Sequence, residues 1–133
     1  MKPSLKTGLA RTKKLTVDES RVIDFMGEDC RVYATPRIIS DVEYTCRNFL
    51  IEHLDPGEDS VGTKVNWEHV GPALLGAEVT ISIKLVSVDG RRVTFEAAVN
   101  DGADAVARGT HERFIVEVHK VRERLLKKKA RRN

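Results

Sequence analysis

A glutamate and a histidine, distant in the sequence, both fall on apolar faces of the elements predicted to carry them. The stretch 35–53 has the period of one amphipathic helix, and Glu43 falls on its apolar stripe. The stretch 61–70 alternates like a half-buried strand and places His69 on its apolar face. If the helix crosses the sheet, we expect these two side chains to meet. A carboxylate and an imidazole withheld from water are groups that hydrolytic enzymes use as acids and bases.

The residues that share these two faces define the expected interior. The helical stripe contains Ile39, Glu43, Cys46 and Leu50. The strand face contains Val61, Thr63, Val65, Trp67 and His69. A purely structural interpretation competes with a catalytic pair. In it, His69 is a hydrogen-bonded residue at the edge of the core, and Glu43 is partly exposed to solvent. The two residues alone do not separate these alternatives.

The start and the end of the helix are both marked in the sequence. Thr35 is a residue type that caps a helix with its hydroxyl, and Pro36 suits the first helical position. The string Asp55-Pro56-Gly57 cannot continue a helix. At about 1.5 Å per residue, an element over 35–53 is about 30 Å long, which is enough to cross a small sheet.

Four strand-like stretches follow the helix, and Asp-Gly pairs between them predict hairpins. These stretches are 61–70, 77–88, 91–99 and 105–118. Before the helix, we expect an edge strand at 9–17, whose charged side chains disfavour pairing with another strand. We also expect an irregular connection with a short turn of helix at 20–33. This pattern predicts an α+β hotdog fold, in which a curved antiparallel sheet wraps one long central helix.

The basic charge of the chain is concentrated near its C-terminal end. With 133 residues, of which 41% are hydrophobic, we expect a single domain over 1–118 and a basic tail over 119–133. The tail holds eight of the 23 Lys and Arg residues and one of the 20 Asp and Glu residues, so the domain itself is mildly acidic. No aromatic residue is interleaved with the basic ones. We therefore expect a solvated helical end and no nucleic acid partner.

Composition sets limits on compartment and metal content. Cys30 and Cys46 are too few for a disulfide framework and lie in no metal-binding spacing, so we expect two thiols and no metal site. No apolar run reaches the roughly 20 residues of a membrane helix. The first residues also lack the apolar stretch of a secretory signal. We expect a cytoplasmic protein with no membrane partner.

Several short strings at fixed spacing give the chain a resemblance to a known family. They are Tyr33-Ala34-Thr35, Glu43 eight residues after Thr35, Gly62-Thr63, His69 seven residues after Gly62, Asp101-Gly102, and Gly109-Thr110-His111-Glu112-Arg113. Together they resemble the fluoroacetyl-CoA thioesterase family of hotdog proteins, over most of the chain from about residue 32 to residue 118. The resemblance implies an acyl-CoA thioesterase, with CoA entering as part of the substrate and no separate cofactor.

The resemblance also implies roles for five residues. Thr35, Glu43 and His69 match the catalytic trio of the family, and Gly62 and Arg113 match positions that help to hold the acyl thioester. For thioester hydrolysis, Glu43 could activate a water molecule or attack the carbonyl carbon and form a mixed anhydride. His69 would orient or deprotonate the water or the Thr35 hydroxyl. The amides at the helix start offer positive dipole ends to an oxyanion.

The spacing of the trio creates a geometric constraint. Thr35 and Glu43 lie about 12 Å apart along the axis of one straight helix, so they cannot touch within it. Either Thr35 lies on a loop that doubles back, or a second subunit completes the site. Because a meander with a free edge can pair with its own copy, we favour a homodimer.

The chain departs from the family at a few positions, and other functions compete. Pro36 and Arg37 follow Thr35, and the aromatic residue that precedes the threonine in the fluoroacetyl enzyme aligns with Asp29. We therefore expect a short-chain acyl-CoA as substrate, without selectivity for the fluoroacetyl group. The alternatives are a non-catalytic hotdog that binds acyl-CoA or another small ligand, and a nucleic-acid module acting through 120–132. The remaining histidines, His53, His111 and His119, form no recognisable constellation.

Overall fold

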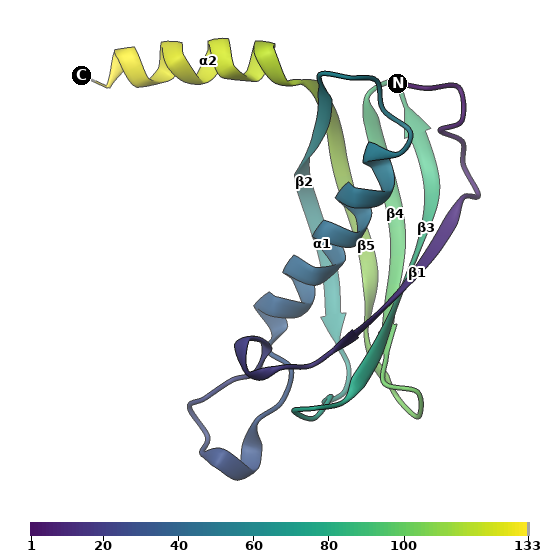
Figure 1. Cartoon of the computed structure of the whole chain (residues 1–133), viewed down its shortest axis with the longest axis vertical. Helices are drawn as coiled ribbons and strands as arrows, with labels where there is room; N and C mark the ends of the chain where they lie inside the picture. Colours follow the sequence, from purple (N-terminus) through teal and green to yellow (C-terminus); the bar gives the residue numbers. More distant parts are fainter. Residues whose placement is uncertain (133) are drawn as a thin grey trace.

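Five antiparallel strands form one sheet, and a long helix crosses its face (Figure 1). The computed structural model describes residues 1–132. The strands are β1 (Ala10–Thr16), β2 (Glu58–His69), β3 (Glu78–Asp89), β4 (Arg92–Asn100) and β5 (Ala105–Glu117), in the spatial order β1-β3-β4-β5-β2. The helices are α1 (Thr35–Ile51) and α2 (Val118–Arg131), with two 3-10 turns, η1 (Glu19–Arg21) and η2 (Glu28–Cys30).

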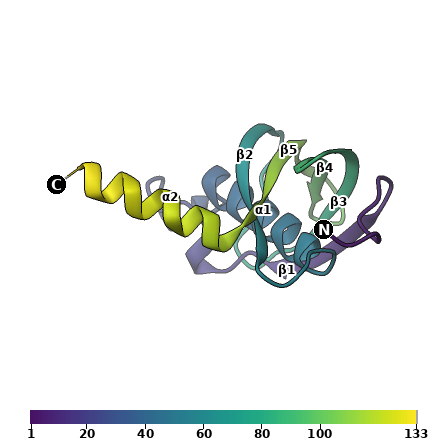
Figure 2. The same ribbon diagram turned by 90° about the horizontal axis from the view of Figure 1, so that it is seen from above.

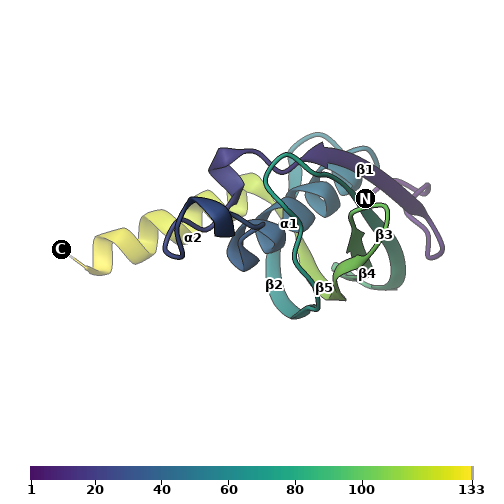
Figure 3. The ribbon, with the colours of Figure 1, turned by 90° about the horizontal axis from the view of Figure 1, so that it is seen from below.

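The sheet curves around α1, which lies against its inner face (Figures 2 and 3). Several apolar side chains of the helix are turned toward the sheet and almost fully buried: Ile38, Val42, Cys46, Phe49 and Leu50. Alternate residues of β3 and β4 pack against them. Phe49 meets Phe95 of β4 edge-on, with ring centres 5.8 Å apart. The predicted α+β hotdog fold, with a curved antiparallel sheet around one long helix, is confirmed.

Helix α1 begins at the predicted residue but without the predicted cap. Ala34 is the N-cap, and Thr35 and Pro36 are the first two helical residues. The expectation that Thr35 caps the helix is wrong, because its hydroxyl is hydrogen-bonded to His69 instead. The helix ends at Ile51 rather than at residue 53. The connection before it is irregular, as expected, but contains two short turns, η1 and η2, where one was expected.

Strand β2 contains a bulge that divides its alternation into two parts. The register with β5 shifts between Gly62 and Lys64, so Thr63 is the extra residue. Before the bulge, Gly62 faces the helix and Val61 is exposed. After the bulge, the inner face passes to odd-numbered residues such as His69. The expectation that Val61 and Thr63 share the face of His69 is therefore wrong, because the extra residue exchanges the two faces.

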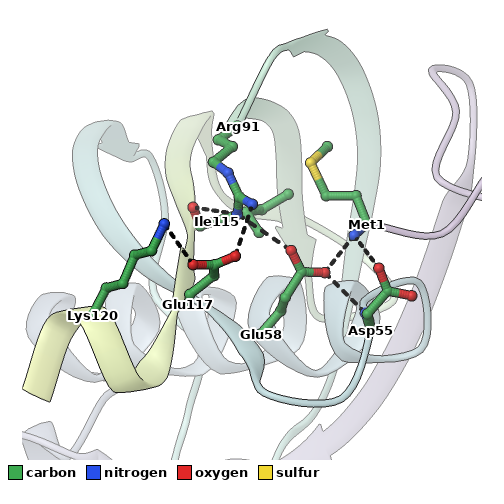
Figure 4. A network of polar contacts seen from close by, with 7 residues as sticks. All are labelled: Met1, Asp55, Glu58, Arg91, Ile115, Glu117 and Lys120. Atoms are coloured by element: carbon green, nitrogen blue, oxygen red, sulfur yellow. Dashed lines mark hydrogen bonds and ion pairs between the residues drawn. The ribbon is translucent and has the colours of Figure 1, made fainter.

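A network of polar contacts closes the end of the sheet where β2 begins and β5 ends (Figure 4). Arg91 donates to the carboxylate of Glu58 at 3.2 Å and to the carbonyl oxygen of Ile115 at 3.4 Å. The terminal ammonium of Met1 also donates to Glu58, and this contact lowers the pKa of the Glu58 carboxyl. The network thus ties three separate segments together at this end.

Helix α2 leaves the body of the molecule from the same end (Figure 1). It contains seven of the eight basic residues of the predicted tail, and none of its residues is buried. Neither α2 nor any other helix within residues 1–132 is long and apolar enough to cross a membrane.

An ion pair between α1 and β2 provides a test of how the helix is held. Arg47 donates from Nε and Nη2 to the two carboxylate oxygens of Asp59, at 3.0 and 2.6 Å. This pairing lowers the pKa of Asp59 below its ordinary value of 3.8. The pair therefore stabilises the fold at higher pH, and its contribution is lost as the pH falls through the lowered pKa.

We expect Asp59→Asn to lower the free energy of unfolding by about 1 kcal/mol at pH 7, because the substitution removes a charge-assisted pair that is partly exposed. Urea denaturation of both proteins between pH 7 and pH 3 measures the effect. The difference between them should narrow below about pH 4, because Asp59 of the unfolded wild-type chain then binds a proton that the folded protein, with its lowered pKa, binds only at lower pH. A difference that stays constant across this range would contradict the assignment.

Candidate active site

Glu43 projects from the middle of α1 onto the bulge of β2. Gly62 lies directly against its carboxylate. A Cβ placed on Gly62 would collide with Oε1 of Glu43 and would lie 3.2 Å from Cε1 of His111. The missing side chain at this position is what lets the carboxylate approach the strand. No hydrogen bond or ion pair joins Glu43 to another residue in the described range 1–132, so its carboxylate has no structural partner there.

The carboxylate of Glu43 lines a cavity of about 230 Å³. The other lining residues are Tyr44, Arg47, Asp59, Ser60 and Arg113. Tyr44 is 64% exposed, whereas Arg113 is only 5% exposed. The cavity therefore leads from the surface to a buried cation. Within residues 1–132, no three His, Cys, Asp or Glu side chains are grouped so as to hold a metal ion.

Arg113 is fixed by contacts from two strands. Its Nε donates to Oγ of Ser60 and its Nη2 donates to the carbonyl oxygen of Ser60, both at 2.8 Å. Its Nη1 lies 3.2 Å from Nε2 of His111. Burial lowers the pKa of Arg113, and the negative charge of Glu43 opposes this effect. The result is a cation held in a set orientation beside Glu43.

Thr35 and His69 form a second cluster, at the first turn of α1. Oγ1 of Thr35 lies 2.7 Å from Nδ1 of His69, the last residue of β2. When Nδ1 carries the lone pair, the Thr35 hydroxyl donates to it and the imidazole is placed to act as a base. The positive end of the α1 dipole lies at the same turn. This cluster therefore offers a hydroxyl, a base and a helix start in one place.

Contacts immediately before Thr35 fix the path of the chain into α1. Tyr33 is fully buried, and its hydroxyl donates to the carboxylate of Asp41 in α1. Arg21 donates to the same carboxylate at 2.9 Å. Burial raises the pKa of Tyr33, so its hydroxyl keeps the donated proton. These contacts set where Thr35 meets His69.

The two clusters lie at different points along the molecule. Gly62, next to Glu43, and His69 lie about 20 Å apart along β2 at the usual rise per residue. Thr35 and Glu43 lie about 12 Å apart along α1. The expectation that Glu43 and His69 meet is therefore wrong within a single chain. The cause is the path of α1, whose first turn, and not its middle, meets the end of β2.

His111 is the residue of the first cluster that the sequence did not reveal. It is 2% exposed, its Nδ1 lies 3.0 Å from the carbonyl oxygen of Lys64, and its Nε2 contacts Arg113. Burial lowers the pKa of its imidazole. The alternation of β5 does place His111 and Arg113 on one face, and this pattern predicts that their side chains contact each other. Gly62 is a residue type that can mark a bulge, and the structure has one directly after it, but the alternation alone did not show that Thr63 is the extra residue or that the Lys64 carbonyl faces His111.

The curved five-stranded sheet around one central helix defines a hotdog protein. A hypothetical protein from Thermus thermophilus, described as a thioesterase superfamily member, shares this fold. It superposes with a TM-score of 0.86 at 23% identity, covering 97% of this chain and 96% of that one.

More similar proteins narrow the class to one family. Residues 17–119 match the family model for fluoroacetyl-CoA-specific thioesterase. The fluoroacetyl-CoA thioesterase of Streptantibioticus cattleyicolor is 33% identical over 97 residues, which cover 73% of this chain and 70% of that protein. A crystal structure of a variant of the fluoroacetyl-CoA-specific thioesterase FlK superposes with a TM-score of 0.87 at 28% identity, covering 96% of this chain and 99% of that one. The chain therefore belongs to this thioesterase family, as the resemblance in its sequence predicted.

The close approach at Gly62 can be tested directly. In Gly62→Ala the new methyl group must displace the carboxylate of Glu43, which is the free end of a flexible side chain. We expect kcat for acyl-CoA hydrolysis to fall about 100-fold, because the carboxylate moves by about 1 Å or more. The free energy of unfolding should change by less than about 1 kcal/mol. Wild-type kcat in the folded variant would show that the contact has no part in the reaction.

Proposed function

We propose that this protein hydrolyses a short-chain acyl-CoA to a free acid and CoA, with Thr35, Glu43 and His69 as its catalytic residues. Membership of a thioesterase family supports the reaction class. The observation that carries the proposal is the carboxylate of Glu43, which lies against Gly62 in a cavity that also contains Arg113. This chemistry needs no cofactor, since CoA enters as part of the substrate.

Two routes lead from this arrangement to the products, and both use Glu43. In the first, the carboxylate takes a proton from a water molecule as the water oxygen attacks the carbonyl carbon. The tetrahedral intermediate then expels the CoA thiolate and leaves the free acid. In the second, the carboxylate attacks the carbonyl carbon and expels the thiolate, forming a mixed anhydride. Water then hydrolyses the anhydride to the free acid and restores Glu43.

Gly62 and Arg113 are assigned to substrate binding in both routes. Negative charge develops on the carbonyl oxygen in the tetrahedral intermediate, and a fixed donor aimed at that oxygen stabilises it. The buried guanidinium of Arg113 is such a donor, because its contacts with Ser60 already fix its plane. Gly62 leaves room for the thioester beside Glu43.

We further propose that a second copy of the chain completes the site. Strand β2 is an edge of the sheet, and it exposes Val61 and Val65, at 46% and 41%. The other edge, β1, carries three basic side chains that disfavour pairing: Arg11, Lys13 and Lys14. The free edge of β2 is therefore the one that suits an isologous contact with its own copy.

The sequence positions on β2 suggest where the two-fold axis lies. An axis at Asn66 would pair β2 with its copy in antiparallel fashion, with Asn66 opposite its own counterpart. Residues the same number of paired positions from the axis then lie opposite each other on the same face. Three paired positions from Asn66, with the bulged Thr63 not counted, Gly62 of one chain would face His69 of the partner subunit. The Thr35–His69 cluster of one chain would thus reach Glu43 of the other, and the two-fold axis would generate two such sites.

The proposed substrate class rests on the relatives and on one local difference. Other crystal structures of FlK hold fluoroacetate with CoA, at 28% identity to this chain, or acetyl-CoA, at 26% identity. These ligands support a short acyl group on CoA. At the position aligned with the aromatic residue of the fluoroacetyl enzyme, this chain has the exposed Asp29 in η2. We therefore propose a short-chain acyl-CoA without fluoroacetyl selectivity.

Removal of either side chain tests the assignment. We expect Glu43→Gln and His69→Ala each to lower kcat by about 100-fold or more, because each removes one acid–base group. Release of CoA from a panel of acyl-CoA substrates, followed with a thiol-reactive dye, measures the rate. Melting temperatures should stay close to that of the wild-type protein, since neither group belongs to the buried apolar core.

Two exposed residues serve as matched controls. Glu96 is exposed on β4, away from the β2 edge, and His119 is exposed on α2. Glu96→Gln and His119→Ala should keep the wild-type rate. Unchanged hydrolysis in Glu43→Gln and His69→Ala would refute the catalytic roles. A rise in melting temperature with acyl-CoA but no turnover in the wild-type protein would indicate the non-catalytic binding function instead.

A further inference from the structure

We propose that His111 is a positioning residue, whose Nε2 holds the guanidinium of Arg113 in the orientation that binds the thioester. This inference rests on the proposed function and assigns a role to a residue outside the catalytic trio. His111 belongs to the string Gly109-Thr110-His111-Glu112-Arg113, but no catalytic or substrate-binding role has been assigned to it. Its support is a chain of contacts that runs from the β2 bulge, through the imidazole, to Arg113.

The two contacts of the imidazole determine which nitrogen carries the proton. Nδ1 lies 3.0 Å from the carbonyl oxygen of Lys64, which can only accept, so Nδ1 must donate. Nε2 lies 3.2 Å from Nη1 of Arg113, which can only donate, so Nε2 must accept. One neutral tautomer, protonated at Nδ1, satisfies both partners. The protonated ring would place an N–H against the guanidinium and lose that contact.

The surroundings favour the neutral ring. Burial lowers the pKa of His111, and the positive charge of Arg113 acts in the same direction. The hydrogen bond to the Lys64 carbonyl and the negative charge of Glu43, on α1, act against it. The side chain is buried between α1 and the sheet, so solvent does not compete for either nitrogen.

Arg113 keeps two donors free after its contacts are made. A guanidinium has five N–H groups. Three of them are used here, one each on Nε and Nη2 for Ser60 and one on Nη1 for His111. The Ser60 contacts engage Nε and Nη2, and His111 is the contact that engages Nη1. Because the guanidinium lines the same cavity as Glu43, its two remaining N–H groups are available to a carbonyl oxygen. His111 thus fixes Nη1, the nitrogen of the Arg113 guanidinium that Ser60 does not contact.

A pair of variants separates the positioning role from a merely structural one. His111→Asn keeps an amide that can donate to the Lys64 carbonyl but has no acceptor at the Nε2 position. His111→Gln reaches the Nε2 position with its amide oxygen and so keeps an acceptor for Arg113. We expect His111→Asn to lower kcat about 10-fold, corresponding to one hydrogen bond to a charged group, and His111→Gln to recover most of that loss. A structural role in holding the bulge predicts the reverse order.

A double variant tests whether the effect passes through Arg113. In an Arg113→Lys background the guanidinium that His111 would orient is absent, so adding His111→Asn should change kcat no further. The melting temperature of each variant is measured in parallel. Full additivity of the two effects, or equal activity of the Asn and Gln variants and the wild-type protein, would overturn the inference.

The tautomer provides a readout that does not depend on hydrolysis. In protein labelled with 15N in histidine, the ring nitrogens of His111 should report a neutral ring protonated at Nδ1 at pH 7. A ring protonated at Nε2, or at both nitrogens, cannot accept from Arg113 and would overturn the inference even in an active enzyme. A wild-type protein that hydrolyses no acyl-CoA would instead overturn the proposed function, and with it the catalytic consequence of this contact.

Discussion

The contact between the Glu43 carboxylate and the bare backbone at Gly62 is the constraint on which the site depends. A helix packed on a sheet normally separates its polar groups from the strands by a layer of side chains. Here the strand has no side chain at the point of contact, and a bulge follows it. The carboxylate can therefore enter the space between the two layers. The cation and the imidazole that surround it, Arg113 and His111, come from the neighbouring strand and are fixed before any ligand arrives.

A second constraint follows from the length of the elements. The helix and strand that bring Glu43 to Gly62 also carry Thr35 and His69, but they hold that pair at the other end of β2. Because Thr35 and Glu43 are about 12 Å apart along α1, and Gly62 and His69 about 20 Å apart along β2, one chain does not bring all four residues to one point. In the dimer that we propose, a two-fold axis would reverse the direction of β2 and so bring the Thr35–His69 pair of one chain to Glu43 of the other without any change in the fold. This would explain why the free edge and both halves of the proposed site occur on the same strand.

The sequence predicted those features that depend on local pattern. The amphipathic period of 35–53, the charged edge strand and the Asp-Gly hairpins all correspond to elements of the structure, and the spaced motifs identified the family. Three features were missed because they depend on contacts between distant segments. Thr35 was expected to cap its helix, but the nearby imidazole takes its hydroxyl. Gly62 was compatible with a bulge, but the alternation did not show that the extra residue is Thr63, and the contact of His111 with the Lys64 carbonyl depends on that bulge.

The central claim is that Glu43 of one chain works with His69 of another, and mixed dimers test it directly. Two variants, Glu43→Gln and His69→Ala, would be co-expressed with different affinity tags, and the dimer that contains one copy of each would be isolated by sequential purification. In a site shared between chains, such a dimer has one site with both substitutions and one with neither. We predict that it hydrolyses acyl-CoA at about half the wild-type rate, although each variant alone is nearly inactive. A mixed dimer as inactive as its parents, or a protein that remains monomeric while fully active, would contradict the account.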